Sequence, residues 1–157
     1  MPHTSAIAAT TPDVDTAARL RAALGRLSRR LRPTEAGAAA GLTPTRVTIV
    51  LTVVRDGPIR LSELAESEGI NPTMLSRAIS NLVDAGLLQR NCDAGDRRSA
   101  WVQSTAAGRQ LAKRMRTERT DAVKLALSGL DDGDREALER ALPALEALAE
   151  QLPGRRA

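Results

Sequence analysis

A stripe of leucines at helical spacing dominates the N-terminal part of the chain. They recur at intervals of four, three and four residues, with arginines between them: Leu20, Leu24, Leu27 and Leu31. This interval places them on one face of a helix. We expect the helix to begin near Asp15, after a loose tail over residues 1–14, and to stop at Pro33. Gly37 to Gly41 is then expected to form a flexible link.

A second helix is predicted from residue 43 onward. Thr43 supplies a capping hydroxyl and Pro44 occupies the first helical position, which is a favoured start for a helix. The β-branched stretch "VTIVLTVV" that follows favours a strand by its local composition. Because the cap and the length up to Asp56 favour a helix, we predict a helix here.

The next two segments predict a helix-turn-helix motif. Ser62 can cap a short helix over residues 63–68, which Gly69 ends. Asn71 and Pro72 open another helix, again with a capping side chain and a first-turn proline. The residues expected to face the core are Leu64, Ala65, Leu75, Ala78, Ile79 and Leu82. Two helices joined by so short a turn are typical of a helix-turn-helix.

Beyond Gly86 the hydrophobic period shortens, and a β-hairpin is predicted. The runs "LLQRNC" and "SAWVQS" are short extended segments on either side of the turn. Helical spacing returns from Thr105 to Gly129, with apolar residues that can share a face: Leu111, Met115, Ala122, Leu125 and Ala126. Asp131 caps a last helix, in which Pro143 is expected to produce a kink because it removes a backbone donor.

These elements together predict a mainly α fold with a small β-hairpin wing. We expect a winged helix-turn-helix with N- and C-terminal dimerisation helices, a fold that the family resemblance described below implies. Leucine stripes on terminal helices are costly to expose in a monomer, so we expect a homodimer. The leucines expected to make it are Leu20, Leu24, Leu27, Leu138, Leu142 and Leu145.

Composition narrows the chemistry that this fold can carry. The sole histidine, His3, lies in the tail, and a single cysteine, Cys92, forms neither a zinc cluster nor an internal disulfide. No phosphate-binding glycine loop follows a strand. We therefore expect no enzyme, no metal and no cofactor. The chain shows no secretory signal and no apolar run long enough to span a membrane, so we expect a cytoplasmic protein.

The distribution of charge qualifies the net charge of +4. Residues 57–108 hold five basic and six acidic side chains, so the predicted helix-turn-helix and hairpin are about neutral. The positive excess lies over residues 109–124 and on the first helix. Electrostatics alone therefore gives a weak argument for DNA, and the argument depends on particular side chains.

The second helix of the motif carries the candidate base contacts. A helix fits the major groove of B-DNA, where hydroxyls, amides and guanidinium groups bond base edges or phosphates. The residues opposite its apolar face are Thr73, Ser76, Arg77, Ser80 and Asn81. An ordinary solvated helix face has a similar composition, so the position on this motif is what favours the functional interpretation.

Residues 61–108 resemble the core of the MarR (multiple-antibiotic-resistance regulator) family. The resemblance rests on three pieces in the family's order: Gly86-Leu87 after the second helix, Asp96-Arg97-Arg98 in the wing, and Thr105-Ala106-Ala107-Gly108 after it. It extends over about residues 15–152 when the leucine-striped helices are included. The resemblance implies a winged-helix homodimer on pseudo-palindromic double-stranded DNA, usually a repressor and often released by a small-molecule effector.

The resemblance also implies roles and boundaries. Arg98 matches the family's arginine and is expected in the minor groove, where narrow grooves concentrate negative potential. Arg97 is expected on a phosphate, Asp96 orients an arginine, and Arg109 and Lys113 could reach phosphates. The expected divisions are a tail over 1–14, dimerisation helix and linker over 15–42, DNA-binding domain over 43–108, dimerisation helices over 109–152, and a tail over 153–157.

Two alternatives stay open at the level of sequence. A winged helix can serve as a protein-interaction module in which the helix face or the wing binds a protein. Cys92 could make the protein a redox-responsive regulator, although no basic cluster on its strand obviously lowers the pKa of the thiol. Trp101, the sole aromatic residue, is expected to pack under the wing rather than to contact a ligand.

Overall fold

A computed structural model describes residues 14–93 and 96–152, with the side chains of residues 92–99 outside the described part. The chain divides into two compact units, residues 1–32 and 33–157. The first unit contains helix α1 (Val14–Leu31), which confirms the helix predicted from the leucine stripe. The carboxylate of Asp15 lies in its first turn and Arg29 and Arg30 in its last, each at the end that the helix dipole favours.

The second unit begins with a short helix where a flexible link was expected. Residues Glu35–Ala39 form α2, so the prediction of a link from Gly37 to Gly41 was wrong. The hydroxyl of Thr34 accepts a hydrogen bond from the Gly37 backbone N–H at 3.2 Å, and the Glu118 carboxylate accepts one from Ala36 N–H at 3.0 Å. Gly37 is buried, and its surroundings leave little room for a side chain: an added Cβ would stand 2.7 Å from Thr34 Oγ1. Close packing, rather than flexibility, therefore explains this glycine.

Helix α3 (Pro44–Asp56) follows, with Thr43 as its cap, so the cap outweighed the β-branched composition as expected. Strand β1 (Ile59–Arg60) leads directly into helix α4 (Leu61–Glu68). The predicted cap at Ser62 was wrong because the helix already begins at Leu61. The Glu63 carboxylate instead accepts a bond from Arg60 N–H at 3.3 Å, and Gly69 ends the helix in the left-handed conformation.

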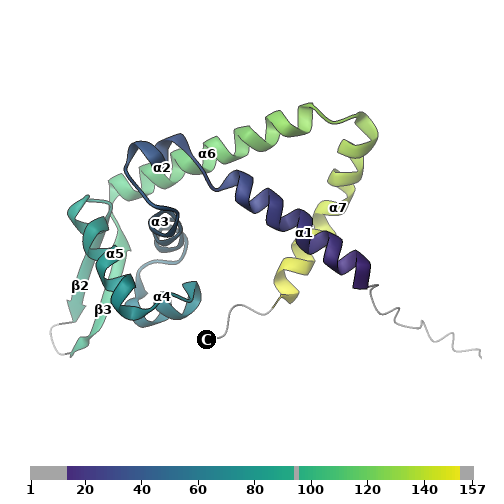
Figure 1. The fold of residues 1–157 in the computed structure, drawn as a ribbon. Coiled ribbons are helices and arrows are strands. Elements are labelled where there is room, and N and C mark those ends of the chain that lie inside the picture. Colours follow the sequence, from purple (N-terminus) through teal and green to yellow (C-terminus); the bar gives the residue numbers. More distant parts are fainter. Residues whose placement is uncertain (1–13, 94–95, 153–157) are drawn as a thin grey trace, which may run out of the picture. The chain divides into compact units, whose positions relative to one another are not determined.

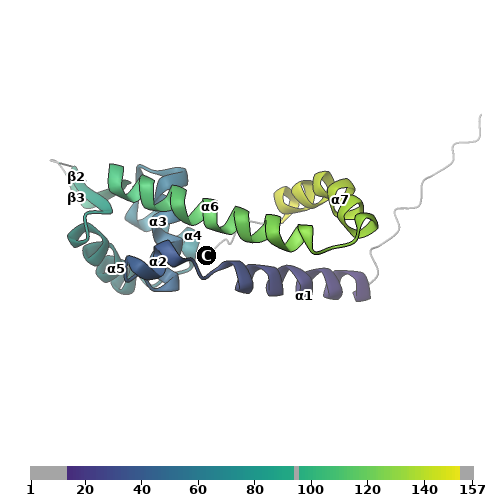
Figure 2. The same ribbon diagram turned by 90° about the horizontal axis from the view of Figure 1, so that it is seen from above.

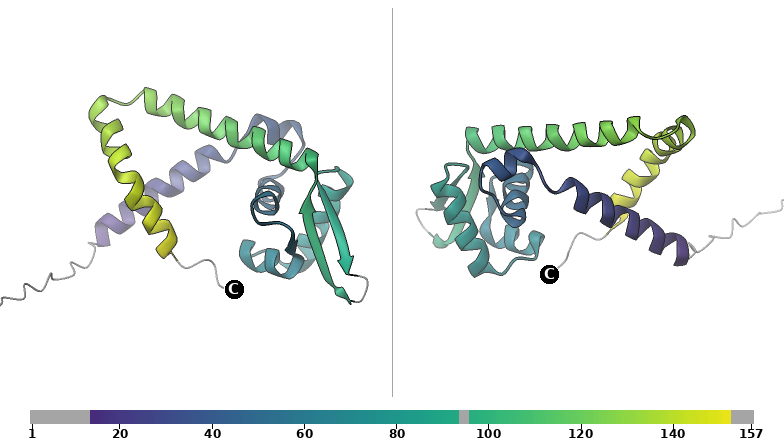
Figure 3. Two further views of the ribbon diagram at one scale, coloured as in Figure 1. Left: turned by 180° about the vertical axis from the view of Figure 1, so that it is seen from behind. Right: turned by 45° about the horizontal axis from the view of Figure 1, so that its top comes forward.

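Helix α5 (Pro72–Asp84) completes the helix-turn-helix, and strands β2 (Leu88–Asp93) and β3 (Asp96–Ser104) form the predicted hairpin (Figure 1). The sheet has the order β1-β3-β2 and is antiparallel, with Ile59 opposite Val102 and Arg90 opposite Val102 from the other side. Strand β1 was not predicted, since two residues are too short to show a period. Figure 3 shows the two long strands running beside the helix-turn-helix.

Helices α6 (Ala106–Ser128) and α7 (Asp132–Gln151) end the unit. Asp131 caps α7 as predicted, and Thr105, where helical spacing was expected to return, is the cap of α6. The long course of α6 is clear in Figure 2. Only its first half is buried: Leu111 and Met115 lie in the core, whereas Ala122, Leu125 and Ala126 are exposed. Helix α7 continues on both sides of Pro143, so the proline does not end the helix, and the kink expected there stays a prediction.

One apolar core holds the helix-turn-helix, the sheet and α6 together. Its fully buried side chains come from each of these elements and are all aliphatic or thioether groups. They include Ile49, Val53, Leu64, Leu75, Ile79, Leu82, Leu88, Val102, Leu111 and Met115. All six residues predicted to face the core lie in it or against it, with Ala78 half-buried at its edge.

Candidate nucleic-acid interface

Helix α5 is fixed at its start and along one face. The Asn71 side chain accepts a hydrogen bond from Thr73 N–H at 2.9 Å, and Pro72 holds the first helical position. Leu75, Ile79 and Leu82 are each no more than 1% exposed, so the buried face sets the rotation of the helix about its axis. The opposite face is thereby held toward solvent on a rigid support.

Four of the five side chains predicted for this outer face are exposed, and the fifth is half-buried. Thr73, Arg77, Ser80 and Asn81 are open to solvent, whereas Ser76 is partly covered. The Ser80 hydroxyl donates to the Ser76 carbonyl at 3.1 Å, which leaves its oxygen lone pairs as acceptors. The structure therefore brings the predicted residues to one helix face, with Ser76 at its margin.

Sequence reasoning missed a shallow groove beside this face. It runs between the start of α3 and the outer side of α5, and is lined by Thr43, Thr45, Arg46, Ile70, Met74, Arg77, Ala78 and Asn81. Two arginines and no acidic side chain are among these residues. A helical wheel would have placed Met74 beside Arg77 and Asn81, but nothing in the sequence pattern brings α3 to them.

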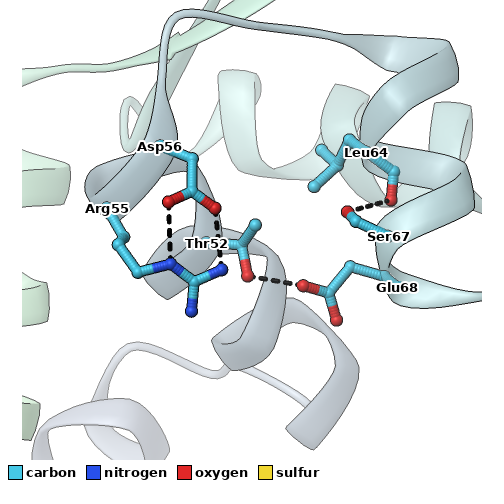
Figure 4. Close-up of polar contacts among 6 residues, drawn as sticks. All are labelled: Thr52, Arg55, Asp56, Leu64, Ser67 and Glu68. Atoms are coloured by element: carbon cyan, nitrogen blue, oxygen red, sulfur yellow. Dashed lines mark hydrogen bonds and ion pairs between the residues drawn. The ribbon is translucent and has the colours of Figure 1, made fainter. Parts of the chain in front are cut away.

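Figure 4 shows the polar contacts at the end of α3, one of which joins α3 to the helix-turn-helix. Thr52, which is 4% exposed, donates its hydroxyl to Glu68 Oε1 at 2.5 Å and so ties α3 to the end of α4. Arg55 forms a two-bond pair with Asp56, at 2.8 and 2.7 Å. Hydrogen bonding to Arg55 lowers the pKa of the Asp56 carboxyl, and the same bond raises the pKa of Arg55.

The Thr-x-x-Gly sequence after the wing joins three elements. The Thr105 hydroxyl donates to the Gly86 carbonyl at 2.7 Å and accepts from Gly108 N–H at 3.0 Å, while Thr105 N–H donates to Leu87 O at 3.1 Å. Gly108 is buried against the Leu87 carbonyl, where a Cβ would stand only 2.1 Å from the oxygen. The end of α5, the start of β2 and the first turn of α6 are thus fixed to one another.

The wing is described for its backbone but not for the side chains at its tip. Asp96, Arg97 and Arg98 begin strand β3, and Cys92 lies on β2; their side chains are outside the described part. At the base of the wing the Arg60 guanidinium lies over the ring of half-buried Trp101, 5.0 Å from its centroid. Trp101 is thus covered from that side by an element of the sheet.

The two cations predicted on α6 and the predicted dimerisation leucines lie at or near the surface. Arg109 is exposed and donates to the Ser104 carbonyl at 2.9 Å, and Lys113 is exposed one turn farther along α6. The predicted dimerisation leucines are all exposed or half-buried within the described residues. They are Leu20, Leu24, Leu27, Leu138, Leu142 and Leu145.

Comparison with known proteins identifies the family. Residues 42–100, which hold the helix-turn-helix and most of the wing, match the model of the MarR family. This segment belongs to the MarR family. The resemblance stated from the sequence and the winged-helix fold class are both confirmed.

Other relatives and solved structures are similar to this chain over most of its length. An uncharacterized HTH-type transcriptional regulator of Mycobacterium bovis is 28% identical over 141 residues, which are 90% of this chain and 97% of that one. The crystal structure of a transcriptional regulator from Thermotoga maritima has a TM-score of 0.72 at 21% identity, covering 88% and 96% of the two chains. A mutant of S. aureus MepR bound to an oligodeoxyribonucleotide has a TM-score of 0.60 at 15% identity, covering 85% and 97%.

Among the described residues, no helix is long and apolar enough to cross a membrane.

Proposed function

We propose that the protein is a sequence-specific, double-stranded DNA-binding transcriptional regulator. The observation that carries this proposal is the outer face of α5. It presents Thr73, Arg77, Ser80 and Asn81 from the second helix of a helix-turn-helix whose rotation is fixed by a fully buried opposite face. Side chains of this kind read base edges when such a helix enters a major groove.

Support for the nucleic acid as partner comes from two sides. The groove beside α5 is lined by Arg46 and Arg77 and by no acidic residue, which suits a phosphate-bearing surface. The S. aureus MepR mutant, a protein of the same fold, was crystallised with an oligodeoxyribonucleotide. In the proposed complex, Arg98 enters the minor groove, Arg97 contacts a phosphate, and Asp96 orients an arginine. Arg109 and Lys113 supply further phosphate contacts.

We infer that the active form is a homodimer on a pseudo-palindromic operator. Helices α1 and α7 contain no buried residue among those described, although each carries a stripe of leucines. Leu142 and Leu27 are 52% and 57% exposed, and a second copy of the chain would cover such side chains. Two-fold symmetry then places half-sites about one helical turn, roughly 10 bp, apart.

Selection of bound sequences from a random double-stranded DNA pool tests this proposal. We expect an enriched pseudo-palindrome, protected in footprinting at moderate salt. Arg77→Ala should weaken binding to that site at least fivefold, and Leu142→Glu should shift the protein toward monomer in analytical ultracentrifugation. Recovery of no common sequence, together with a salt slope near zero for DNA binding, would contradict the proposal and favour the protein-interaction module.

Repression, rather than activation, is the proposed direction of regulation, because it is the usual one in the family. A small-molecule effector and a redox role for Cys92 stay predictions. Operator affinity measured after oxidation, with a Cys92→Ser variant alongside, separates the two triggers.

A further inference from the structure

One large apolar side chain is exposed where the fold gives no structural reason for it. Among the residues whose exposure is described, the exposed large hydrophobic side chains lie on α1, on the second half of α6, on the loop after it, on α7 and at Leu152 directly after α7, with one exception. The exception is Met74, which is 66% exposed on α5. The leucine stripes explain the others as a surface for a second copy of the chain, but Met74 is on the DNA-reading helix.

Met74 lies on the exposed side of α5 and is not packed against the core. Arg77 and Asn81, three and seven residues on, share with it the groove against α3, which Ile70 and Ala78 also line from the edge of the core. The half-buried apolar residues packed against the core include Ala78 and Val83 of α5 but not Met74. The thioether is therefore exposed in a groove where two arginines, an asparagine and threonines, all groups that suit DNA, lie beside the apolar Ile70 and Ala78.

We propose that Met74 reads thymine through its C5-methyl group in the major groove, an inference that rests on the proposed function. The thymine methyl is the apolar feature that distinguishes A·T from the other base pairs in that groove. A methionine side chain is unbranched and polarizable, so it adapts its contact to a single methyl group. Exposure of this side chain in the free protein is then a consequence of its use in the complex.

The position of Arg77 locates the thymine relative to the other contacts. Three residues along a helix correspond to a rise of about 4.5 Å, and neighbouring base pairs are about 3.4 Å apart. The thymine that Met74 contacts therefore lies within one or two base pairs of the base or phosphate that Arg77 contacts. Arg46, across the groove on α3, is placed to meet the backbone of the same half-site.

Replacement of thymine by deoxyuridine tests the proposal because it removes the methyl group alone. The selected operator is prepared with deoxyuridine at each thymine in turn, and the dissociation constant is measured for the full-length protein. We expect one thymine per half-site at which the wild-type protein loses about fourfold, the effect of one buried methyl group. Met74→Ala should show no loss at that thymine, whereas Met74→Leu should retain a loss.

Ser80→Ala is the matched control on the same helix. It should weaken binding to the thymine and deoxyuridine operators alike, because the serine does not contact the methyl group. Thermal unfolding verifies that the variants are folded, which the exposure of Met74 leads us to expect. If no deoxyuridine position distinguishes wild type from Met74→Ala, the inference is overturned while the proposed function stands. If no operator is selected at all, both fall together.

Discussion

Substitution of Gly108 by alanine tests how the DNA-reading unit is held together. An alanine Cβ would stand 2.1 Å from the Leu87 carbonyl oxygen and 3.1 Å from its carbon. Ordinary carbon–oxygen contacts begin at about 3.3 Å, so the first turn of α6 must move away from β2 by about 1 Å. The obstacle is backbone, which has no alternative rotamer to adopt.

The expected cost follows from the hydrogen bonds that this movement breaks. Thr105 and Gly108 make three of them, to Gly86 O, to Leu87 O and to each other. At a net value of about 1 kcal/mol each they contribute about 3 kcal/mol. The higher helix propensity of alanine returns up to about 1 kcal/mol, which leaves a loss of about 2 kcal/mol. For a chain of this size the loss lowers the melting temperature by about 4–8 °C.

Gly133→Ala is the matched control, because Gly133 also lies in the first turn of a helix. Its Cβ would meet only Asp131 Oδ1, at an ordinary 3.4 Å. Circular dichroism melts and urea titrations of the three proteins should place Gly133→Ala at or above wild type and Gly108→Ala clearly below it. Equal stability of the two variants would refute the reasoning that close backbone approach, rather than helix propensity, requires glycine at position 108.

Three further predictions follow from the polar contacts and the wing. Thr52→Val should lower the free energy of unfolding by about 1–2 kcal/mol in urea titrations, because it removes the hydrogen bond to Glu68. Thr48→Val is the control and should be nearly neutral, because the exposed Thr48 hydroxyl bonds only to the Pro44 carbonyl of its own helix. Arg55→Gln should raise the pKa of Asp56 toward its usual value in an NMR titration; the small stability due to this exposed pair is present above the usual aspartate pKa and is lost as pH falls through the lowered one. Arg98→Ala should weaken operator binding by about 1–3 kcal/mol in fluorescence anisotropy with no change in melting temperature, and unchanged affinity would remove Arg98 from the interface.

The sequence predicted the elements whose signals are local. Thr43, Asn71 and Asp131 begin helices where their capping side chains indicated, because a cap needs only the next turn of its own chain. The apolar face of α5 is likewise set by spacing within one helix. Caps and apolar spacing can both be recognised within one segment, without knowing which other segments pack against it.

The failures concern contacts between segments far apart in the sequence. Helix α2 depends on the Glu118 carboxylate, 82 residues from the Ala36 N–H that it accepts from, so composition alone indicated a flexible link. Strand β1 exists because Arg60 and Ile59 pair with β3. Met74 was not named with the outer residues of α5, although helical spacing sets it beside Arg77 and Asn81; its 66% exposure in the structure places it there.

The charge pattern of residues 57–108 and the geometry of α5 together explain how a helix-turn-helix and wing of nearly zero net charge would bind DNA selectively. Each cation that neutralises a phosphate adds affinity for any sequence, so a unit with few of them gains little from non-specific binding. Residues 57–108 hold five basic side chains against six acidic ones, whereas the groove beside α5 is lined by Arg46 and Arg77 and by no acidic residue. A few well-placed arginines then position the helix, and the remaining discrimination must come from groups that read bases. Within the described outer side of α5, those groups are short polar side chains and one exposed thioether, which contact donors, acceptors and a methyl group respectively.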